Sequence, residues 1–185
     1  MAKLVIGISG ASGATLGVEA LKALRILGVE THLVVSDAAR QTLAQECGLS
    51  LEHVRELADH WHPATAIGAA IASGSFRTMG MLVAPCSIRS MAEIAIGVTS
   101  SLLTRAADVT LKQKRPLVLM VRESPLHYGH LKSMAELALM GAIIAPPVPA
   151  FYAKPQSVED IVANMVGRAL DLFGLDTGNW HRWGE

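Results

Sequence analysis

Small residues with hydroxyl side chains follow a short apolar run near the start of the chain. Residues 3–15 read Lys-Leu-Val-Ile-Gly-Ile-Ser-Gly-Ala-Ser-Gly-Ala-Thr, and a helical pattern follows at once. This order predicts a strand, a tight turn and a helix start. Free N–H groups at a helix start favour an anion, and Ser9, Ser12 and Thr15 add hydroxyl donors. The pattern predicts a nucleotide or phosphate site at the carboxyl end of a first parallel strand.

The spacing of the glycines narrows this prediction. They fall at Gly7, Gly10, Gly13 and Gly17, which is not the G-x-G-x-x-G of dinucleotide sites, and no Walker A lysine follows. The segment 10–14 also lacks the last glycine of a nucleophile elbow. The alternative is a tight turn whose small residues serve packing alone.

Polar residues also follow the next two apolar runs, where ligands bind in parallel sheets. Ser36 either holds a phosphate or caps the next helix, and the two roles are compatible. Ser87 and Ser90 can bond a flat heterocycle. Cys86 has no adjacent base in the sequence, so we interpret it as a packing residue rather than a nucleophile.

A charged pair follows the apolar run 117–121 directly. Glu123 can move protons there and Arg122 can hold an anion. The alternative is that the two side chains form a mutual ion pair.

Further candidate ligand-binding residues lie on expected helices or in the segment before the last one. Arg105, Asp108 and Lys112 share a helix face and form either a salt-bridge ladder or part of a site. Tyr152 follows a proline-rich segment that is either a pocket wall or a rigid connector. Arg168 falls at the rim of an apolar helix face, where it either snorkels or reaches a phosphate.

The histidines predict no metal site. His53, His60 and His62 are potential ligands, but no carboxylate or cysteine completes a recognised spacing around them.

Composition sets the class of protein. The chain has 185 residues, of which 51% are hydrophobic and 17% charged, with a formal net charge of zero. We expect one domain with buried subunit contacts, and neither nucleic acid nor a membrane as partner. Two isolated cysteines and the lack of a signal-peptide pattern favour a reducing compartment, the cytoplasm.

Apolar runs and helical patterns alternate along the chain. This predicts a three-layer α/β domain, Rossmann-like or flavodoxin-like, with a mostly parallel sheet. Segment 59–76 is expected to be a flexible excursion near the ligand edge. The expected strands are 4–8, 31–35, 81–84, 117–121 and 142–145, and the expected helices are 15–27, 38–46, 102–112, 131–140 and 158–173.

Six motifs together resemble the UbiX-type flavin prenyltransferases, in order and spacing over nearly the full chain. They are Gly10-Ala11-Ser12-Gly13-Ala14, Pro85-Cys86-Ser87, Arg105-Ala106-Ala107-Asp108-Val109, Arg122-Glu123-Ser124-Pro125-Leu126, Pro149-Ala150-Phe151-Tyr152 and Arg182-Trp183-Gly184. The short loop between Leu57 and Gly80 is similar to the branch associated with hydroxyarylic acid decarboxylases.

The resemblance implies an activity. Such proteins bind FMN and join a dimethylallyl group from dimethylallyl monophosphate to N5 and C6 of the reduced flavin, without a metal. The product, prenylated FMN, serves a UbiD-type decarboxylase. The family forms large homo-oligomers, commonly dodecamers, with sites at subunit contacts.

The resemblance also implies residue roles. Glu123 and Ser12 are the implied catalytic residues, and Trp183, in a tail of about residues 174–185, is expected near a neighbouring subunit's site. The implied FMN-binding residues are Gly10, Ala11, Ser12, Ser36, Ser87, Ser90, Arg105 and Arg122. The implied prenyl-phosphate residues are Lys112, Arg122, Tyr152 and Arg168.

Three departures from the family pattern leave open a protein that binds flavin but prenylates slowly, or that prefers another donor. Val121 stands where proline is usual, Ser90 where threonine is common, and the loop 127–134 lacks the usual acid and asparagine. One rival is an FMN-holding carrier subunit of a decarboxylase system. The other is a relative of flavin-dependent cysteine decarboxylases, although the catalytic histidine and cysteine clamp loop of that class are not evident.

Overall fold

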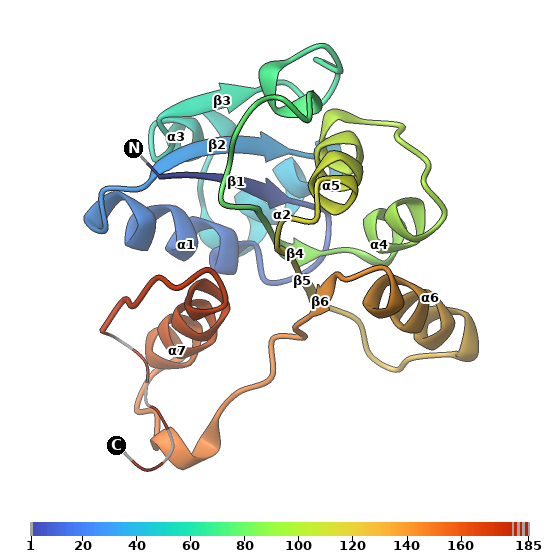
Figure 1. Ribbon diagram of the computed structural model, residues 1–185. Helices are drawn as coiled ribbons and strands as arrows, with labels where there is room; N and C mark the ends of the chain where they lie inside the picture. Colours follow the sequence, from blue (N-terminus) through green and yellow to red (C-terminus); the bar gives the residue numbers. More distant parts are fainter. Residues whose placement is uncertain (1, 179, 181, 183, 185) are drawn as a thin grey trace.

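Six parallel strands form one sheet, in the order β3-β2-β1-β4-β5-β6 (Figure 1). The computed structural model describes residues 2–178, 180, 182 and 184. β1 and β4 lie at the centre of the sheet. From β1 the strands follow in chain order to β3 at one edge, and from β4 they follow in chain order to β6 at the other. The strands are β1 Lys3–Ile8, β2 Glu30–Val35, β3 His60–His62, β4 Met81–Cys86, β5 Leu117–Val121 and β6 Ile143–Ile144.

Helices cover both faces of the sheet, as predicted for a three-layer α/β domain. Side chains alternate between the faces because successive residues of a strand point to opposite sides. Leu4 and Ile6 pack toward α1, α2, α3 and α7, whereas Val5 packs toward α4, α5 and α6. The helices are α1 Ala14–Ile26, α2 Asp37–Cys47, α3 Leu51–Arg55, α4 Ile88–Ala95, α5 Leu102–Lys112, α6 Tyr128–Leu139 and α7 Val158–Asp171.

Serine caps fix where several helices begin. Ser36 accepts a hydrogen bond from the Ala39 amide at the start of α2, and Ser157 with Asp160 forms a capping box on α7. Ser87 caps α4 in the same way. The predicted capping role of Ser36 is therefore confirmed.

Three short elements escaped the sequence patterns: α3, α4 and β3. Each has eight residues or fewer, so its periodicity is weak. In the expected excursion 59–76 the chain instead forms β3 and a 3₁₀ turn, Ala70–Ala72. Arg115 anchors the end of this segment by donating to the Phe76 and Gly74 carbonyls, at 2.7 and 2.9 Å.

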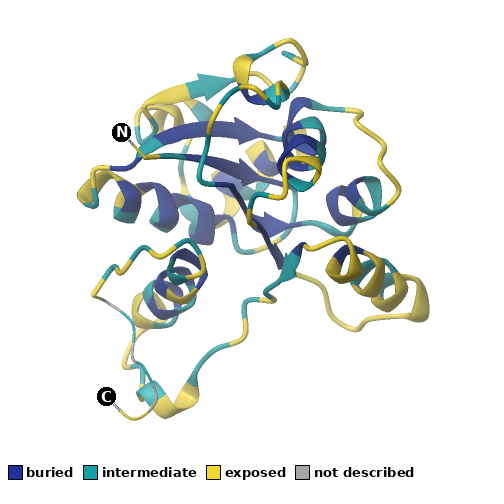
Figure 2. Ribbon diagram, viewed as in Figure 1, coloured by how far each residue is buried: buried dark blue, intermediate teal, exposed yellow. Residues whose placement is uncertain are grey.

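Figure 2 shows the buried central strands and the largely exposed outer surfaces of α6 and of the segment that leads to α7. Tyr128, Leu131 and Leu139 of α6 are exposed although they are large and apolar, and so are Val148 and Phe151. In the part of the chain that the structure describes, every helix is too short or too polar to cross a membrane.

Candidate functional site

A pocket of about 500 Å³ lies at the carboxyl ends of the central strands. The connections from β1 and from β4 lead to opposite sides of the sheet, which makes this edge the switch point where α/β proteins bind ligands. Its lining includes the predicted residues Gly10, Ala11, Ser12, Ser36, Ser87, Ser90, Arg122 and Glu123. It also includes Asp37, Ala38, Ala64, Thr65, Ile88, Arg89, Glu93, Ser100 and Ser101.

Backbone hydrogen bonds bring the strand ends together. The Ser36 amide donates to the Ile8 carbonyl at 2.9 Å, and the Arg122 amide donates to the Cys86 carbonyl at 3.0 Å. Each of these bonds joins the last residue of one strand to the residue just past the end of the neighbouring strand. The residues after β1, β2, β4 and β5 are therefore held around one pocket.

Ser9 is a structural residue, and its prediction as a ligand donor is wrong. It is fully buried. Its hydroxyl donates to the Pro85 carbonyl at 3.0 Å and accepts from the Ser87 amide at 2.7 Å. With both roles of the hydroxyl taken by protein atoms, Ser9 locks the end of β1 to the end of β4.

The small residues of the first turn are needed for packing as well as for access. A Cβ on Gly10 would lie only 2.3 Å from the Cβ of Ala38, and Gly13 has φ +97°, a conformation that favours glycine. Gly10 also lines the pocket. The packing interpretation and the ligand interpretation thus both apply to this turn.

The start of α1 is already occupied by a protein carboxylate. Glu46 Oε2 accepts from the amides of Gly13 and Ala14 at 2.8 and 3.0 Å. Glu46 is exposed, but its partial desolvation opposes ionisation; hydrogen bonds from Ser12, Gly13 and Ala14 and the charge of Arg122 together outweigh this effect and lower its pKa. The amides of Gly13 and Ala14, expected to bind a ligand phosphate, are therefore taken by Glu46 instead, and Ser12 is bonded to the same carboxylate at the pocket.

Arg122 and Glu123 both line the pocket, as predicted. Glu123 Oε1 accepts from the Ser124 amide at 2.9 Å, which holds the carboxylate in place. Among the ion pairs of the described residues, none joins Arg122 to Glu123. The two charges can therefore serve different atoms of a ligand.

Polar residues of α4 and of the loop before α5 complete the lining, and sequence reasoning missed several of them. Ser87 Oγ donates to Ser90 Oγ at 3.2 Å. Arg89 Nε donates to Glu93 Oε1 at 2.9 Å, and Ser100 also bonds Glu93. A weak helix-start signal could have revealed α4. Ser87 is followed three residues later by Ser90 and then by apolar residues.

Cys86 is confirmed as a packing residue. It is fully buried, and burial raises the pKa of its thiol to about 12. A thiol with this pKa is protonated at neutral pH and is not a nucleophile.

Four other predicted site residues lie outside the pocket of their own chain. Arg105 pairs with Asp108 at 2.9 Å, as in the ladder alternative. Lys112 is the last residue of α5, whereas Ser101, at the pocket, precedes its first. Arg168 lines a separate cavity of about 370 Å³ beside the 144–148 segment. Tyr152 lies in the 3₁₀ turn Phe151–Ala153.

The prediction for Trp183 lies outside the described residues. One chain therefore assembles the predicted flavin-binding residues except Arg105, but not the predicted phosphate residues Lys112, Tyr152 and Arg168.

The fold and the pocket define the class as a flavoprotein. The profile of the family described as Flavoprotein matches residues 1–170. The flavin prenyltransferase UbiX of Escherichia coli is 55% identical over 176 residues, covering 95% of this chain and 93% of that protein. Flavin prenyltransferase UbiX of Neisseria meningitidis is 55% identical over 181 residues, covering 98% of this chain and 96% of that protein. The chain belongs to the UbiX flavin prenyltransferases, a family of flavoproteins.

Solved structures agree with this assignment. The structure of AnUbiX (PadA1) in complex with FMN and dimethylallyl pyrophosphate is 48% identical and superposes with a TM-score of 0.98, covering 100% of this chain and 98% of that one. A dodecameric FMN-dependent UbiX-like decarboxylase from Escherichia coli is also 48% identical, with a TM-score of 0.96, covering 99% of this chain and all of that one. The cysteine decarboxylase TvaF, at 15% identity and a TM-score of 0.67, shares the fold alone.

Proposed function

We propose that this protein is a flavin prenyltransferase that joins the dimethylallyl group of dimethylallyl monophosphate to N5 and C6 of reduced FMN. The observation that carries the proposal is the meeting of Ser12, Arg122 and Glu123 in one pocket at the switch point of the sheet. The product would be prenylated FMN, used by a UbiD-type decarboxylase. We place the activity in the cytoplasm.

The pocket residues fit FMN. The pocket volume of about 500 Å³ is in the range of small-molecule sites. Ser36 Oγ accepts from the Ala39 amide at 3.2 Å, so its own O–H remains to donate to a ligand. Ser90 Oγ likewise accepts from Ser87 and keeps its O–H. Small hydroxyl side chains leave room for a flat ring and can donate hydrogen bonds to a phosphate tail.

Bound reduced FMN supplies an electron-rich ring that can accept the allylic carbon. Glu123 is the residue that moves protons at that ring, since its Oε1 is held by Ser124 while Oε2 remains to exchange a proton. Glu46 orients Ser12 through their hydrogen bond and keeps a negative charge beside the pocket. That charge suits an allylic group that becomes electron-poor as it leaves the phosphate.

Cations hold the departing phosphate in this proposal. Arg122 belongs to the pocket of its own chain. Lys112 lies at the far end of α5, ~15 Å along the helix axis from the pocket end. We therefore infer that Lys112, Tyr152 and Arg168 act in the pockets of other copies of the chain, and that the protein is a homo-oligomer, a dodecamer like the UbiX-like structure from Escherichia coli. The exposed apolar residues of α6 and of segment 148–158 offer surface for such contacts.

The decisive experiment is mass spectrometry of the flavin after anaerobic incubation of the protein with reduced FMN and dimethylallyl monophosphate. We expect a flavin heavier by one dimethylallyl group. Parallel incubation with dimethylallyl pyrophosphate, the ligand in the AnUbiX structure, identifies the preferred donor. If FMN binds but no allylic phosphate gives an adduct, the protein is an FMN carrier instead.

A further inference from the structure

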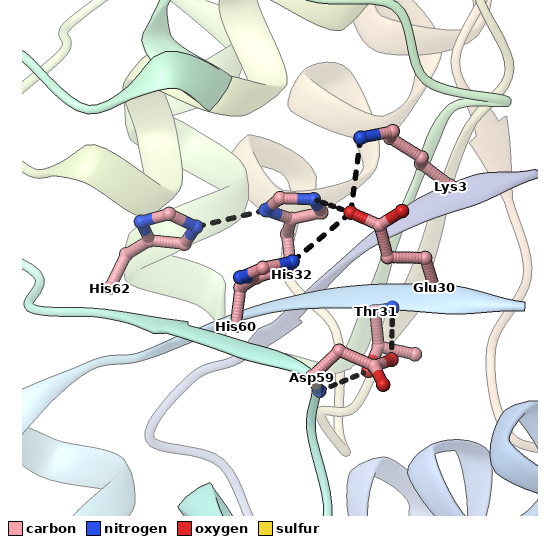
Figure 3. A network of polar contacts seen from close by, with 7 residues as sticks. All are labelled: Lys3, Glu30, Thr31, His32, Asp59, His60 and His62. Carbon is pink, nitrogen blue, oxygen red and sulfur yellow. Dashed lines mark hydrogen bonds and ion pairs between the residues drawn. The ribbon is translucent and has the colours of Figure 1, made fainter. Parts of the chain in front are cut away.

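Three histidines and a glutamate gather on β2 and the neighbouring edge strand β3 (Figure 3). Glu30 is the first residue of β2 and His60 the first of β3, whereas His32 lies in the middle of β2 and His62 is the last residue of β3. None of the four residues is part of the pocket lining. The flavin chemistry proposed above uses none of these residues.

Strand geometry brings the cluster together. Glu30 and His32 are two residues apart on β2 and therefore share one face of the sheet. His60 is the direct partner of His32 in the parallel register of β2 and β3. Glu30 Oε1 lies 3.3 Å from His32 Nε2 and 3.1 Å from His60 Nε2. One ligand atom from each residue lies within 4.8 Å of the others.

We propose that Glu30 Oε1, His32 Nε2 and His60 Nε2 bind a Zn²⁺ ion, with water as the fourth ligand. Bonds of about 2.0–2.2 Å in a tetrahedral site place neighbouring ligand atoms about 3.3 Å apart. The two carboxylate–imidazole distances, 3.3 and 3.1 Å, are close to this separation. Two imidazoles and one carboxylate form a donor set that Zn²⁺ favours.

His62 is a positioning residue for this site. Its Nε2 lies 3.0 Å from His32 Nδ1. When His32 binds the ion through Nε2, its Nδ1 carries the proton and donates a hydrogen bond to His62 Nε2. Such an outer hydrogen bond fixes the tautomer and the ring orientation of a metal-binding histidine.

Two side chains must move when the ion binds. The rings of His32 and His60 stack with centroids 4.6 Å apart, so the His60 ring, whose side chain is 51% exposed, has to tilt toward the ion. Lys3 Nζ lies 3.0 Å from the same oxygen, Glu30 Oε1, and competes with the ion. Its side chain is 32% exposed and can swing outward.

Bound zinc would join the short edge strand β3 to β2. Only three residues form β3, and β2 is its neighbour in the sheet. A metal that bridges two strands favours the folded state by mass action and protects an otherwise weak sheet edge.

Calorimetric titration of the chelator-treated full chain with zinc chloride tests the site, together with thermal unfolding with and without zinc. We expect one equivalent of zinc and a raised Tm. His60→Ala and Glu30→Gln should each weaken binding by ~100-fold or more and remove the rise in Tm, and His62→Ala should weaken binding by ~10-fold. Lys3→Ala should tighten binding, because it removes the competing cation.

His53→Ala is the matched control, because His53 is exposed on α3, where it contacts Ser50 rather than the cluster. It should bind zinc as the parent chain does. Cobalt(II) in place of zinc should give the visible absorption of a four-coordinate site. Zinc that binds equally to the parent, His60→Ala and Glu30→Gln chains, or that does not bind stoichiometrically to a folded parent chain, would overturn the proposal.

Discussion

Glu46 Oε2 lies 2.8 Å from the amide nitrogen of Gly13, although 33 residues separate the two in sequence. The same oxygen accepts from the Ala14 amide, and Ser12 also bonds this carboxylate. A side chain near the end of α2 thereby caps α1 and orients a pocket hydroxyl. The stability of the first turn and the chemistry of the pocket are linked through this one carboxylate.

Glu46→Gln should destabilise the protein by about 0.5–1 kcal/mol at pH 7, because an exposed carboxylate at a helix start contributes about that much. The folded pKa of Glu46 is lowered, so this stability is complete above the pKa of a free glutamate and is lost as the pH falls through the lowered value. Denaturant unfolding of both chains over a series of pH values from 7 downward measures this. A difference that does not shrink as the pH falls would show that charge is not the cause.

Ser12→Leu should abolish FMN binding without unfolding the chain, because Ser12 is exposed at the pocket and a larger side chain fills the approach to the turn. Flavin fluorescence titration measures affinity, and circular dichroism checks the fold. Ser75→Leu is the control, since Ser75 is exposed and outside the pocket lining. Unchanged affinity in a folded Ser12→Leu chain would remove this turn from the site.

Glu123→Gln should leave FMN bound but slow adduct formation by ~10²–10⁴-fold, the usual contribution of a general acid–base group. Single-turnover flavin spectra under anaerobic conditions report the rate. Glu136→Gln on the exposed side of α6 is the control. An unchanged rate in Glu123→Gln would limit Glu123 to a structural role.

Arg168→Ala should weaken the prenyl donor rather than the flavin. A lost charge-assisted hydrogen bond is worth roughly 1.5–3 kcal/mol, or ~10–100-fold in donor affinity. The dependence of the adduct rate on donor concentration measures this. If FMN affinity falls instead and donor affinity holds, Arg168 contacts the flavin.

Sites shared between copies make a prediction about mixed assemblies. Light scattering should show a species far above the 19.6 kDa of one chain. Glu123→Gln and Lys112→Ala chains, inactive alone, should regain activity when refolded together. At equal amounts about one quarter of the sites would combine an intact Glu123 with an intact Lys112 from another copy.

Absence of any recovery in such mixed oligomers would place Lys112 and Glu123 in the same chain's site. A monomer in solution would contradict the shared site altogether. Refolding each variant with the parent chain controls for losses during refolding.

Local sequence patterns determined much of the fold and half of the site. Strand–turn–helix alternation gave the layers, because the period of apolar residues is set by residues close together in the chain. The rule that ligands bind at strand ends then gave Ser12, Ser36, Ser87, Arg122 and Glu123, all of which line one pocket.

Tertiary structure alone decided the remaining contacts. The Glu46 carboxylate reaches α1 because α2 packs beside it, and no local pattern records that approach. Glu30 and His32 meet His60 through the register of β2 and β3, which pairs residues 28 positions apart. These contacts depend on which distant segments share a sheet, and that choice is made by the packing of the whole core rather than by any short stretch of sequence.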